Sequence, residues 1–553
     1  MDDEPVEEDE WGDVGRARRG TMPLTTRKDR NAREVGGGVD GGLKSGLESL
    51  PPEGRVPTRK DWRAGSSHHD VGIRARMVRA TERWRTLLDA PRELWIIYAM
   101  KFLSSYSYFS FALVLTLFLT EEYGMSDQAA GWVYGMYGVM STISGVVCGW
   151  IIDSMGVRWS LAVGALVGTV TRLFLAFTGS KTLTVSLLYT ALPLSESLGI
   201  PIMTIGIKRY TNASNRTYAF SFFYSVMNLA ALVAGPLVDL LRRVFKGGLT
   251  VGGDSYSALR LVLITSALAT FVMLAVVCFG IREIEVDENG NVTSFEPNQA
   301  DPWEQTRRVL REPAFWRLAL FTLLLVGVRL VFRHMDATLP KYMTREFGED
   351  APFGLIYAIN PFLIIFLVPV VGLMTKGVDS FSMILYGSFI SGVSPFWVCI
   401  GNFYWAIILF MVTLSVGEAV YSPRVYEYSM EISGKGEEGL YTSLSSAPLF
   451  TVKLIVGGMS GWLLTRFCPE TGPRNSRAMW AIIGATSFVS PILMLLLRDV
   501  IEPRKSNWTA IENGRTVSSS LDTPQAITKE SLDIPVDSDL QSTNLGTHSL
   551  EVK

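Results

Sequence analysis

The sequence predicts an all-α polytopic membrane protein with twelve transmembrane helices in two halves of six. Between residues 93 and 498 the chain holds twelve apolar runs of roughly 20 residues, the length an α-helix needs to cross a bilayer. One longer polar interruption divides these runs into six and six. Small residues recur inside them, as at Gly131, Gly135 and Gly138, and favour close packing of neighbouring helices around a central cavity.

Both ends of the chain are polar. Residues 1–73 combine an acidic start with a Gly-rich stretch and too little apolar surface for a core, which predicts a disordered N-terminal tail. Arginines between residues 74 and 92 alternate with Trp and Leu, so we expect a basic juxtamembrane segment on an anionic cytosolic leaflet. Residues 499–553 are rich in Ser and Thr and predict a second disordered tail.

The spans follow in order between these tails. We expect an N-terminal half over 93–281, a cytosolic linker over 282–313 and a C-terminal half over 314–498. The expected spans are 93–119, 128–151, 158–179, 182–206, 216–241 and 258–281 in the first half, and 314–334, 352–375, 380–401, 403–424, 441–465 and 477–498 in the second.

The distribution of Lys and Arg predicts the orientation. These residues are dense in the N-terminal flank and in the loops after spans two, four and six, which places both termini in the cytosol by the positive-inside rule. Arg242, Arg243 and Lys246, after span five, are exceptions that would lie outside. The pattern does not distinguish a plasma membrane from a vacuole-type membrane.

Composition excludes several classes of protein. The net charge is −2 and the basic residues gather at helix ends rather than in an aromatic-rich patch, so we expect no nucleic-acid partner. No metal-ligand, phosphate-loop or Ser/His/Asp pattern is present, so we expect no enzyme, cofactor or metal. The four cysteines stand alone in or beside apolar runs, and we interpret them as packing residues: Cys148, Cys278, Cys399 and Cys468.

The loop after the second run carries Gly149-x-x-x-Asp153-x-x-Gly156-x-Arg158. The glycines allow a tight turn, Asp153 follows one helix and Arg158 begins the next. This spacing resembles the loop between helices two and three of the major facilitator superfamily. The resemblance implies a cytosolic latch that holds one conformation of a rocking cycle, so we assign these four residues to gating. An ordinary tight turn is the alternative.

Three further stretches carry a narrower resemblance. They are Gly206-Ile-Lys208 followed by Asn215-Arg216 and the run Ala219 to Asn228, then Asn360-Pro361-Phe362, then Gly417-Glu418 with Ser422-Pro423. Their order and spacing resemble the proton-coupled oligopeptide transporter branch over most of 93–498. The resemblance implies that Glu418 contacts the amino group of a substrate, and that Tyr224, Asn228 and Asn360 line the cavity.

Two departures from that branch affect the expected chemistry. Its first helix carries E-x-x-E-R-F for proton coupling and carboxylate binding, whereas the aligned stretch here is Lys101-Phe-Leu-Ser104-Ser105-Tyr106. The lysine expected before the proline of helix four is Ile200, with Glu196 about one turn earlier. The missing glutamates favour an uncoupled permease as an alternative to proton-driven transport.

Ionisable residues inside apolar runs form the main group of site candidates. A charge near the bilayer centre costs at least about 2.5 kcal/mol on the insertion scale, so it usually faces a partner or a wet cavity. The residues concerned are Lys101, Arg172, Glu196, Arg329, Glu418 and Lys453. We place Lys101, Glu196, Glu418 and Lys453 in the substrate site.

Their roles are separate hypotheses. Glu196 and Glu418 are the proton-coupling candidates, with Lys453 as the partner released on protonation; a permanent salt bridge is the alternative. Lys101 lies roughly 12 Å into the first span and either faces the cavity or reaches back to the cytosolic surface. Arg172 and Arg329 either face the interior or reach the outer face.

The seventh span has a polar exit that contains Arg329, Arg333, His334 and Asp336. Arg329 and Arg333 share one helix face at i, i+4. We assign the four residues to a gate that attracts an anionic group, and a membrane-surface anchor is the alternative. Tyrosines near the cavity either line it or pack at interfaces: Tyr106, Tyr108, Tyr134 and Tyr137.

These observations predict a secondary transporter that moves a small polar organic solute, peptide-like or amino-acid-like, by alternating access, with proton coupling as an option. Its partners would be the solute and the lipid bilayer, and we expect a monomer. An uncoupled facilitative permease and a non-transporting nutrient receptor on the same fold are the alternatives. Solute flux separates transporter from receptor, and its dependence on a pH gradient separates coupled from uncoupled transport.

Overall fold

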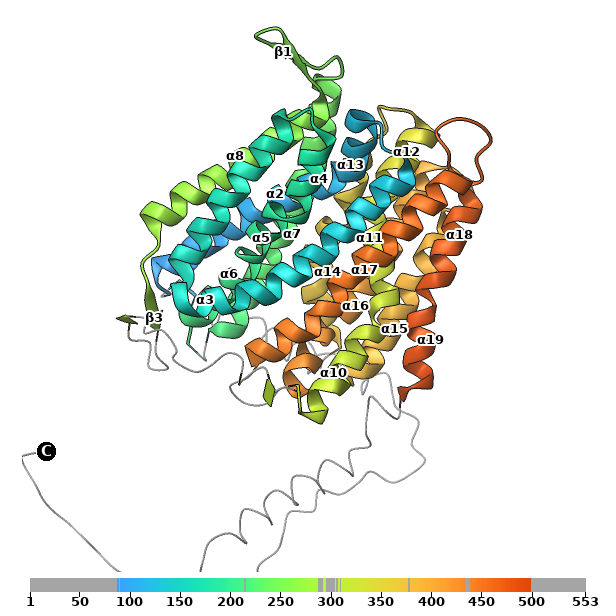
Figure 1. Cartoon of the computed structure of the whole chain (residues 1–553). Helices are drawn as coiled ribbons and strands as arrows, with labels where there is room; N and C mark the ends of the chain where they lie inside the picture. Colours follow the sequence, from blue (N-terminus) through green and yellow to red (C-terminus); the bar gives the residue numbers. More distant parts are fainter. Residues whose placement is uncertain are drawn as a thin grey trace, which may run out of the picture. The chain divides into compact units, whose positions relative to one another are not determined.

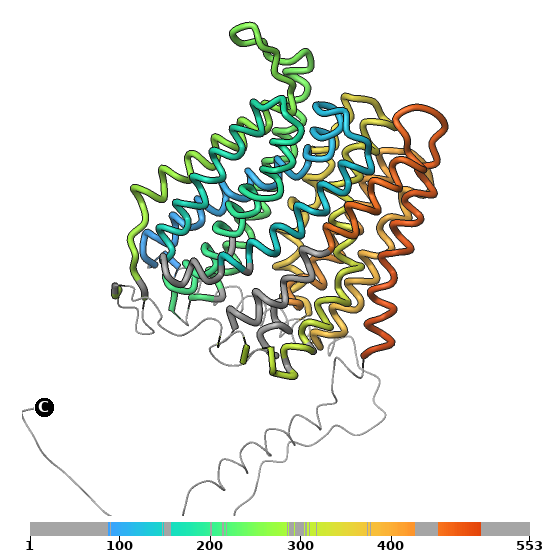
Figure 2. Tube along the Cα trace, viewed as in Figure 1, coloured from blue at the N-terminus to red at the C-terminus, as the bar shows by residue number. Residues whose placement is uncertain are grey.

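The computed structural model describes residues 87–88, 90–212, 215–286, 292–294, 304, 307–308, 310–375, 378–432 and 438–498. The two predicted tails, most of the juxtamembrane segment and much of the linker lie outside these residues. What is described is a bundle of helices in which the first and second halves of the chain lie side by side (Figures 1 and 2).

Three helices of the first half, α3, α4 and α8, begin at serine caps. The Oγ atoms of Ser126, Ser180 and Ser257 each accept a hydrogen bond from a backbone N–H of the following helix. The helices are α2 (Arg92–Tyr123), α3 (Asp127–Phe177), α4 (Lys181–Tyr189), α5 (Ala191–Ser197), α6 (Ile200–Arg209), α7 (Arg216–Val244) and α8 (Ala258–Gly280).

The second half consists of shorter pieces. They are α10 (Pro313–Leu324), α11 (Val326–Ala337), α12 (Leu339–Phe347), α13 (Phe353–Tyr357), α14 (Ile359–Met374), α15 (Ser380–Val393), the 3-10 turn η1 (Ser394–Trp397), α16 (Tyr404–Ile432), α17 (Glu438–Phe467), α18 (Ser476–Ser487) and α19 (Val489–Leu496).

Several helices differ from the predicted spans. Spans two and three run together as α3, which breaks only at Gly156, where φ is 76° and ψ is 178°. Span four is divided into α4, α5 and α6, and span seven bends by 48° between α10 and α11. Interruptions of this kind are tolerated where a helix is covered by its neighbours or lines a cavity.

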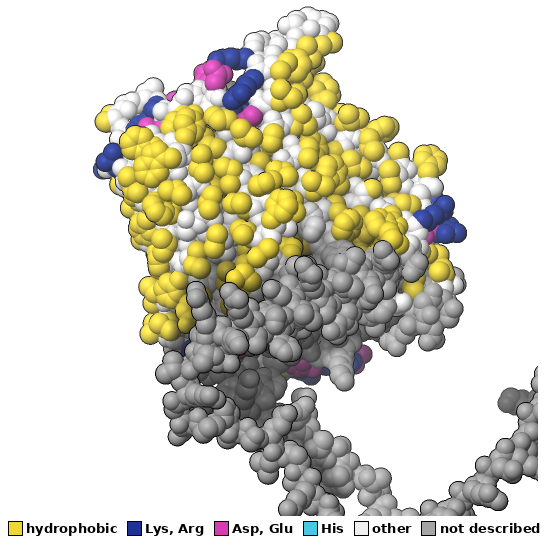
Figure 3. Space-filling model, turned by 180° about the vertical axis from the view of Figure 1, so that it is seen from behind, with side chains coloured by type: hydrophobic (Ala, Val, Ile, Leu, Met, Phe, Trp, Pro, Cys, Tyr) yellow, Lys and Arg dark blue, Asp and Glu magenta, His cyan; other side chains and the backbone are white. Residues whose placement is uncertain are grey.

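Within the described residues, eight helices are long and apolar enough to cross a membrane, and the bent pair α10–α11 would add a ninth. The eight are Arg92–Tyr123, Gly156–Phe177, Lys181–Arg209, Tyr218–Val244, Ala258–Gly280, Phe353–Gly372, Tyr404–Val425 and Ser476–Leu496. Hydrophobic side chains cover much of the face seen in Figure 3. Large apolar residues that are more than half exposed, such as Phe279, Leu268 and Phe366, point to a surface solvated by lipid. The protein is therefore an integral, multi-pass membrane protein, and the count of twelve spans stays a prediction.

Two small hairpins were not predicted from the sequence. Strands β1 (Leu249–Val251) and β2 (Asp254–Tyr256) pair antiparallel around Gly252 and Gly253, whose positive φ values suit a tight two-residue turn. Strands β3 (Ile284–Val286) and β4 (Val292–Ser294) pair antiparallel after α8. These hairpins lie at opposite ends of the helices (Figure 1), which we call the β1 end and the β3 end.

The apolar cores show where the halves meet. One cluster contains residues of both halves, among them Phe118, Tyr134, Val331, Tyr342 and Val456. Toward the β3 end the described residues form two separate clusters, one within the first half and one within the second. The halves therefore share a core toward the β1 end.

Small residues bring the helix backbones of the two halves together. Helix α3 packs against α17, and α7 packs against α13 and α14. A Cβ on Gly131 would overlap the carbonyl oxygen of Gly457, and one on Gly235 would overlap that of Gly354. Glycine is required at these crossings because any side chain would separate the backbones.

Candidate functional site

Three tyrosines of the first half surround a lysine of the second. Tyr108 lies on α2, Tyr134 and Tyr137 lie one turn apart on α3, and Lys453 lies on α17. The Nζ atom of Lys453 is 5.1, 5.9 and 4.5 Å from the ring centroids of Tyr108, Tyr134 and Tyr137. Ring faces at such distances attract a cation. We call these three residues the tyrosine cage.

The glycine after Tyr137 lets Lys453 reach the tyrosine cage. A Cβ on Gly138 would overlap the aliphatic stem of Lys453. The lysine stem thus crosses α3 at a position without a side chain, and only 4% of the residue is exposed. The same run of small residues that packs α3 on α17 therefore places the charge.

Each hydroxyl of the tyrosine cage contacts a charged side chain. Tyr137 donates a short hydrogen bond to Oε2 of Glu196, and Tyr134 donates a longer one, at 3.5 Å, to Oδ2 of Asp336. The Tyr108 hydroxyl accepts from Nη1 of Arg333 at 3.1 Å. The tyrosines thus connect α5 of the first half with α11 of the second through the centre of the bundle.

Two ion pairs complete this network. Arg172 on α3 lies 3.6 Å from Oε1 of Glu196, and its Nε donates to Ser266 Oγ at 3.0 Å. Arg333 Nη1 lies 2.8 Å from Oδ2 of Asp336. The predicted pairing of Glu196 with Lys453 is wrong here, because α5 turns the carboxylate toward Arg172. The alternative in which Arg172 reaches the outer face is also wrong, because the residue is 2% exposed.

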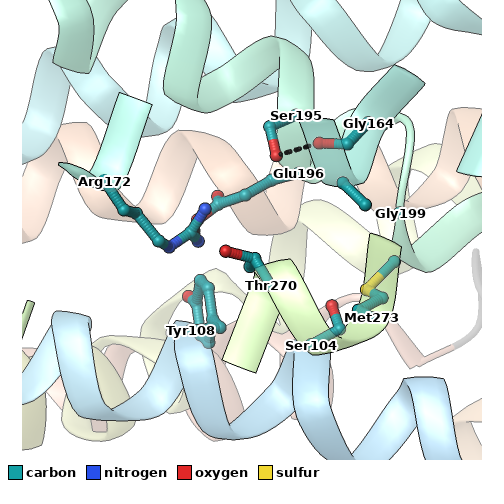
Figure 4. A pocket seen from close by; sticks show the side chains of 10 residues that line it. Ser104, Tyr108, Gly164, Arg172, Ser195, Glu196, Gly199, Thr270 and Met273 are labelled. Atoms are coloured by element: carbon teal, nitrogen blue, oxygen red, sulfur yellow. Dashed lines mark hydrogen bonds and ion pairs between the residues drawn. The ribbon is translucent and has the colours of Figure 1, made fainter. Parts of the chain in front are cut away.

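A small cavity adjoins the Arg172–Glu196 pair within the first half (Figure 4). Its lining comes from α2, α3, α5, the α5–α6 junction and α8, and includes Ser104, Tyr108, Arg172, Glu196 and Thr270. In Figure 4 the guanidinium of Arg172 lies beside Glu196 and above the ring of Tyr108. The cavity holds about 20 Å³, enough for a water molecule but not for a peptide-sized solute. The binding space for a larger solute therefore does not lie in this cavity alone.

Glu418 lies in a second polar cluster on α16. Its Oε2 accepts from Asn360 Nδ2 at 2.9 Å, and the same amide group lies 3.1 Å from Ser415 Oγ. Arg329 and Arg333 are the cations whose charges act on the carboxylate. The structure thus brings Glu418 and Asn360 together. The charge of Arg333 acts on Glu418, and Arg333 also contacts Tyr108 of the tyrosine cage.

Lys101 is buried among apolar side chains rather than extended to a surface. The residue is 1% exposed, and its Nζ lies 4.5 Å from the ring centroid of Phe223 on α7. The alternative in which it reaches back to the cytosolic surface is therefore wrong. Ser104 and Tyr108 follow it on α2 at i+3 and i+7, so the three share one helix face and two of them line the cavity.

Three other predicted cavity residues, Asn228, Tyr224 and Tyr106, lie on α7 and α2. Asn228 Nδ2 donates to the backbone carbonyl of Tyr224 one turn earlier on α7, at 2.9 Å. Asn228 is 8% exposed, and Tyr224 is half-buried. Tyr106 donates to Thr265 Oγ1 at 2.8 Å and packs between α2 and α8. These contacts do not join the tyrosine cage.

Within the motif from Gly149 to Arg158, the described side chains contact the end of α8 and the residues that follow it. Gly156 adopts a positive φ, and a Cβ there would contact the Glu283 carboxylate. Oε1 of Glu283 accepts from the backbone N–H of Arg158 at 2.5 Å, and Arg158 Nη2 donates to the Cys278 carbonyl at 2.7 Å. The side chains of Gly149 and Asp153 lie outside the described residues. Glu283 is a contact that the sequence motif did not indicate.

The polar exit of the seventh span is partly buried, with His334 and Asp336 inside and Arg329 and Arg333 half-buried. Asp336 is 2% exposed and His334 is fully buried, with Nδ1 2.7 Å from Thr338 Oγ1. The guanidinium of Arg329 lies 5.9 Å from the ring centroid of Tyr421. This segment is therefore not a membrane-surface anchor. Arg333 and Asp336 instead contact the hydroxyl groups of Tyr108 and Tyr134 in the tyrosine cage.

Sequence reasoning missed a charged junction between the halves at the β1 end. The carboxylate of Asp127, the first residue of α3, accepts from Lys341 Nζ, Arg345 Nη1 and Arg345 Nη2, each at 2.8 Å. Both cations lie on α12, and the side chains of all three residues are at most 11% exposed. The i, i+4 spacing of Lys341 and Arg345 was a signal in the sequence, but their acidic partner was not.

A second junction lies nearby. Asp239 on α7 accepts from the backbone N–H groups of Gly354 at 3.1 Å and Leu355 at 2.7 Å, at the start of α13. Lys246 and Asp350 form an exposed ion pair of 2.7 Å between the halves. Their hydrogen bond holds the pKa of Asp350 below its ordinary value and raises the pKa of Lys246.

No group of three or more His, Cys, Asp or Glu side chains in the described part of the chain is arranged to hold a metal ion. Its four cysteines are free thiols. The polar groups of the bundle interior are instead ion pairs, amides and tyrosines between two sets of helices, which is the composition of a solute pathway.

These features define the class, a polytopic helical transporter. The sequence model of the Major Facilitator Superfamily matches residues 97–380, just over half of the chain. The chain belongs to the major facilitator superfamily, a family of transporters rather than enzymes. No curated protein sequence matches it significantly.

Solved structures of peptide transporters share the fold. A POT family transporter in complex with 5-aminolevulinic acid is 15% identical, with a TM-score of 0.60 over 74% of this chain and 97% of that one. The POT family transporter PepTSo is 15% identical, with a TM-score of 0.59 over 75% and 99%. A peptide transporter POT in complex with sulfate is 18% identical, with a TM-score of 0.58 over 74% and 95%. At these identities the likeness concerns the fold.

Proposed function

We propose that this protein moves a small polar organic solute across a membrane by alternating access, with the tyrosine cage and its ion pairs at the centre of the pathway. The observation that carries the proposal is the contact of Lys453 with three tyrosines of the opposite half. Rocking of one half against the other would break these contacts, so their strength helps to set which conformation is populated.

The architecture in this proposal has twelve spans. The segments α2, the two parts of α3, α4–α6, α7 and α8 supply six, and α10–α12, α13–α14, α15–η1, α16, α17 and α18–α19 supply six more. With the N-terminal half over 93–281, the linker over 282–313 and the C-terminal half over 314–498, both termini lie in the cytosol at the β3 end. The shared core and charged junctions then seal the outer side, which corresponds to an inward-facing conformation.

The solute class comes from the structural relatives. One of them holds 5-aminolevulinic acid and another a thioalcohol conjugated peptide, both small molecules of amino-acid or peptide character. The interior of this chain offers charged and amide groups suited to such polar groups at Arg172, Glu196, Asn360, Glu418 and Lys453.

Proton coupling at Glu196 and Glu418 is part of the proposal. Protonation of Glu196 would remove its attraction to Arg172 and the hydrogen bond from Tyr137, which is one of the links between α5 and the tyrosine cage. Protonation of Glu418 would weaken its bond with Asn360. A proton would thus alter contacts on both sides of Lys453 without any other chemical step.

The test is uptake of radiolabelled di- and tripeptides into proteoliposomes holding the purified protein, with and without an inward proton gradient. We expect gradient-stimulated uptake that becomes independent of pH in Glu418→Gln or Glu196→Gln. Normal pH stimulation in both variants would contradict the coupling assignment. Flux without any gradient dependence in the unmodified protein would identify an uncoupled permease, and solute binding without flux would identify a receptor.

A matched control is available in the same half. Glu122 pairs with Arg260 at 2.6 Å, and its side chain is 15% exposed against 13% for Glu196. The pair joins α2 to α8 near the β1 end and does not contact the tyrosine cage. Glu122→Gln should therefore retain pH-stimulated uptake, which separates a coupling role from general loss of a buried ion pair.

A further inference from the structure

The acidic side chains in the middle of the bundle are already occupied. Among the described residues, three carboxylates of the candidate site lie in this part of the bundle. Glu196 pairs with Arg172, Asp336 pairs with Arg333, and Glu418 accepts from Asn360 while two arginines act on it. The charges of Glu196 and Asp336 are thus each already balanced by an arginine.

In the described part of the chain, the two lysines of the same region have no direct acidic partner, and the carboxylate on which the charge of Lys453 acts, Asp336, is already paired with Arg333. In the described part of the chain, Lys101 contacts the ring of Phe223 and Lys453 contacts the tyrosine cage, and neither forms an ion pair. Both are at most 4% exposed. An aromatic face replaces only part of the hydration that a buried ammonium loses, so each lysine retains a strong preference for an anion.

Helix α2 connects both lysines with the cavity. Lys101, Ser104 and Tyr108 occupy one face at i, i+3 and i+7, and Ser104 and Tyr108 line the cavity beside Arg172. The ring of Tyr108 lies 5.1 Å from Lys453 Nζ. The seven residues from Lys101 to Tyr108 span roughly 10 Å of α-helix. Because Lys453 lies beside Tyr108, the two lysines are separated by about the length of a small organic molecule.

We propose that the transported solute is an organic anion, a carboxylate that needs no free amino group, and that Lys101 and Lys453 supply the positive charge that binds it. This inference rests on the proposed transport function and specifies its substrate class. Among the described residues, three buried cations (Lys101, Arg172 and Lys453) and two half-buried ones (Arg329 and Arg333) share this region with three carboxylates, so the region has an excess of positive charge that a solute anion would balance.

Three probes on one scaffold test the charge requirement. Alanyl-alanine is a zwitterion, its N-acetyl derivative is an anion, and its amide is a cation of nearly the same size. Thermal stabilisation of the purified full-length protein is measured as each probe is titrated. We expect the N-acetyl derivative to stabilise the protein most and the amide least. Preference for the amide, preference for the zwitterion, or no response to the anion would overturn the inference.

Variants test which cations bind the anion. Lys101→Met and Lys453→Met each remove a charge while keeping an unbranched side chain, and each should weaken the apparent affinity for the N-acetyl derivative by about tenfold or more. The control is Lys208→Met, because Lys208 is an exposed basic residue on α6. Unchanged affinity in both lysine variants would overturn the assignment, even if the proteins fold normally.

A separate measurement distinguishes this inference from the proposed transport function. Accessibility of an engineered thiol between the halves reports alternating access without any solute. Alternating accessibility combined with a cation preference would refute the anion site and leave the transporter proposal intact. Anion binding without alternating accessibility would refute transport and leave the anion site intact.

Discussion

The junction at Asp127 makes a prediction about conformational balance. Asp127→Asn removes the charge that receives three hydrogen bonds from Lys341 and Arg345 across the two halves. The substitution preserves size and leaves the first turn of α3 in place. It should therefore destabilise the conformation closed at the β1 end relative to one that is open there.

The expected size of the effect follows from burial. Hydrogen bonds to charged groups contribute about 1.5–3 kcal/mol each, and removing one member of a buried charged pair costs about 2–5 kcal/mol. An asparagine side chain retains part of the bonding, so we expect a shift of about 2–3 kcal/mol. That shift corresponds to roughly 30- to 150-fold in the equilibrium constant between closed and open forms.

Thiol labelling measures this equilibrium. Thr116 is 1% exposed on α2, and its Oγ1 lies 3.4 Å from the Ala337 carbonyl of the opposite half. A cysteine at position 116, in a background without the native cysteines, is reachable only when the β1 end opens. Its labelling rate in proteoliposomes should rise with the open fraction, by roughly 30- to 150-fold in the Asp127→Asn background.

Asp350→Asn is the matched control for this experiment. Asp350 also pairs with a lysine between the halves, at 2.7 Å, but its side chain is 65% exposed. Solvent screens such a pair, so labelling at position 116 should change little. Equal labelling rates in Asp127→Asn and the unmodified protein, with both folded, would refute the conclusion that the Asp127 junction holds the β1 end closed.

Three further predictions concern packing, pH and transport. Gly131→Ala should destabilise the protein by about 1–3 kcal/mol in thermal unfolding, because the added Cβ overlaps the backbone of Gly457, whereas Gly372→Ala, with open space around it, should not. The lysine partner of Asp350 lowers the pKa of its carboxyl group, so the ion pair stabilises the protein above the ordinary Asp pKa. This stabilisation is lost as the pH falls through the lowered pKa. The melting temperature of Asp350→Asn should therefore converge with that of the unmodified protein in acid. Tyr137→Phe removes the hydroxyl that donates to the α5 carboxylate and should reduce proton-stimulated uptake with little change in thermal stability, whereas unchanged uptake would separate this hydroxyl from coupling.

Local composition was sufficient to predict the membrane class and much of the helical pattern. Runs of apolar residues predict spans because a bilayer-crossing chain must satisfy its backbone hydrogen bonds internally. Gly156 marked a break between two spans, and the structure breaks α3 at that residue. Breaks inside α4–α6 and between α10 and α11 were not visible in the sequence, because they depend on how neighbouring helices cover the exposed backbone groups.

The candidate site, too, was predictable from the sequence only in part. Burial of a charge in an apolar run is a local property, so the sequence alone identified Lys101, Arg172, Glu196, Glu418 and Lys453 as residues that need a partner or a cavity. The crossing and rotation of the packed helices decide which partner each of these residues has. Glu196 therefore faces Arg172 instead of a lysine, as a result of packing between α3 and α5.

Tertiary structure alone assembled the contacts between the halves. Tyr134 and Asp336 are 202 residues apart, and Arg345 lies 218 residues from Asp127, so no local pattern indicates that they meet. Small residues on α3 and α17 allow the backbones to approach, and this approach places Lys453 among the three tyrosines. The sequence by itself determined that the chain enters a membrane and which charged residues fall inside its apolar runs. The packing of one half on the other decided which charges are paired, because the partners come from helices far apart in the sequence.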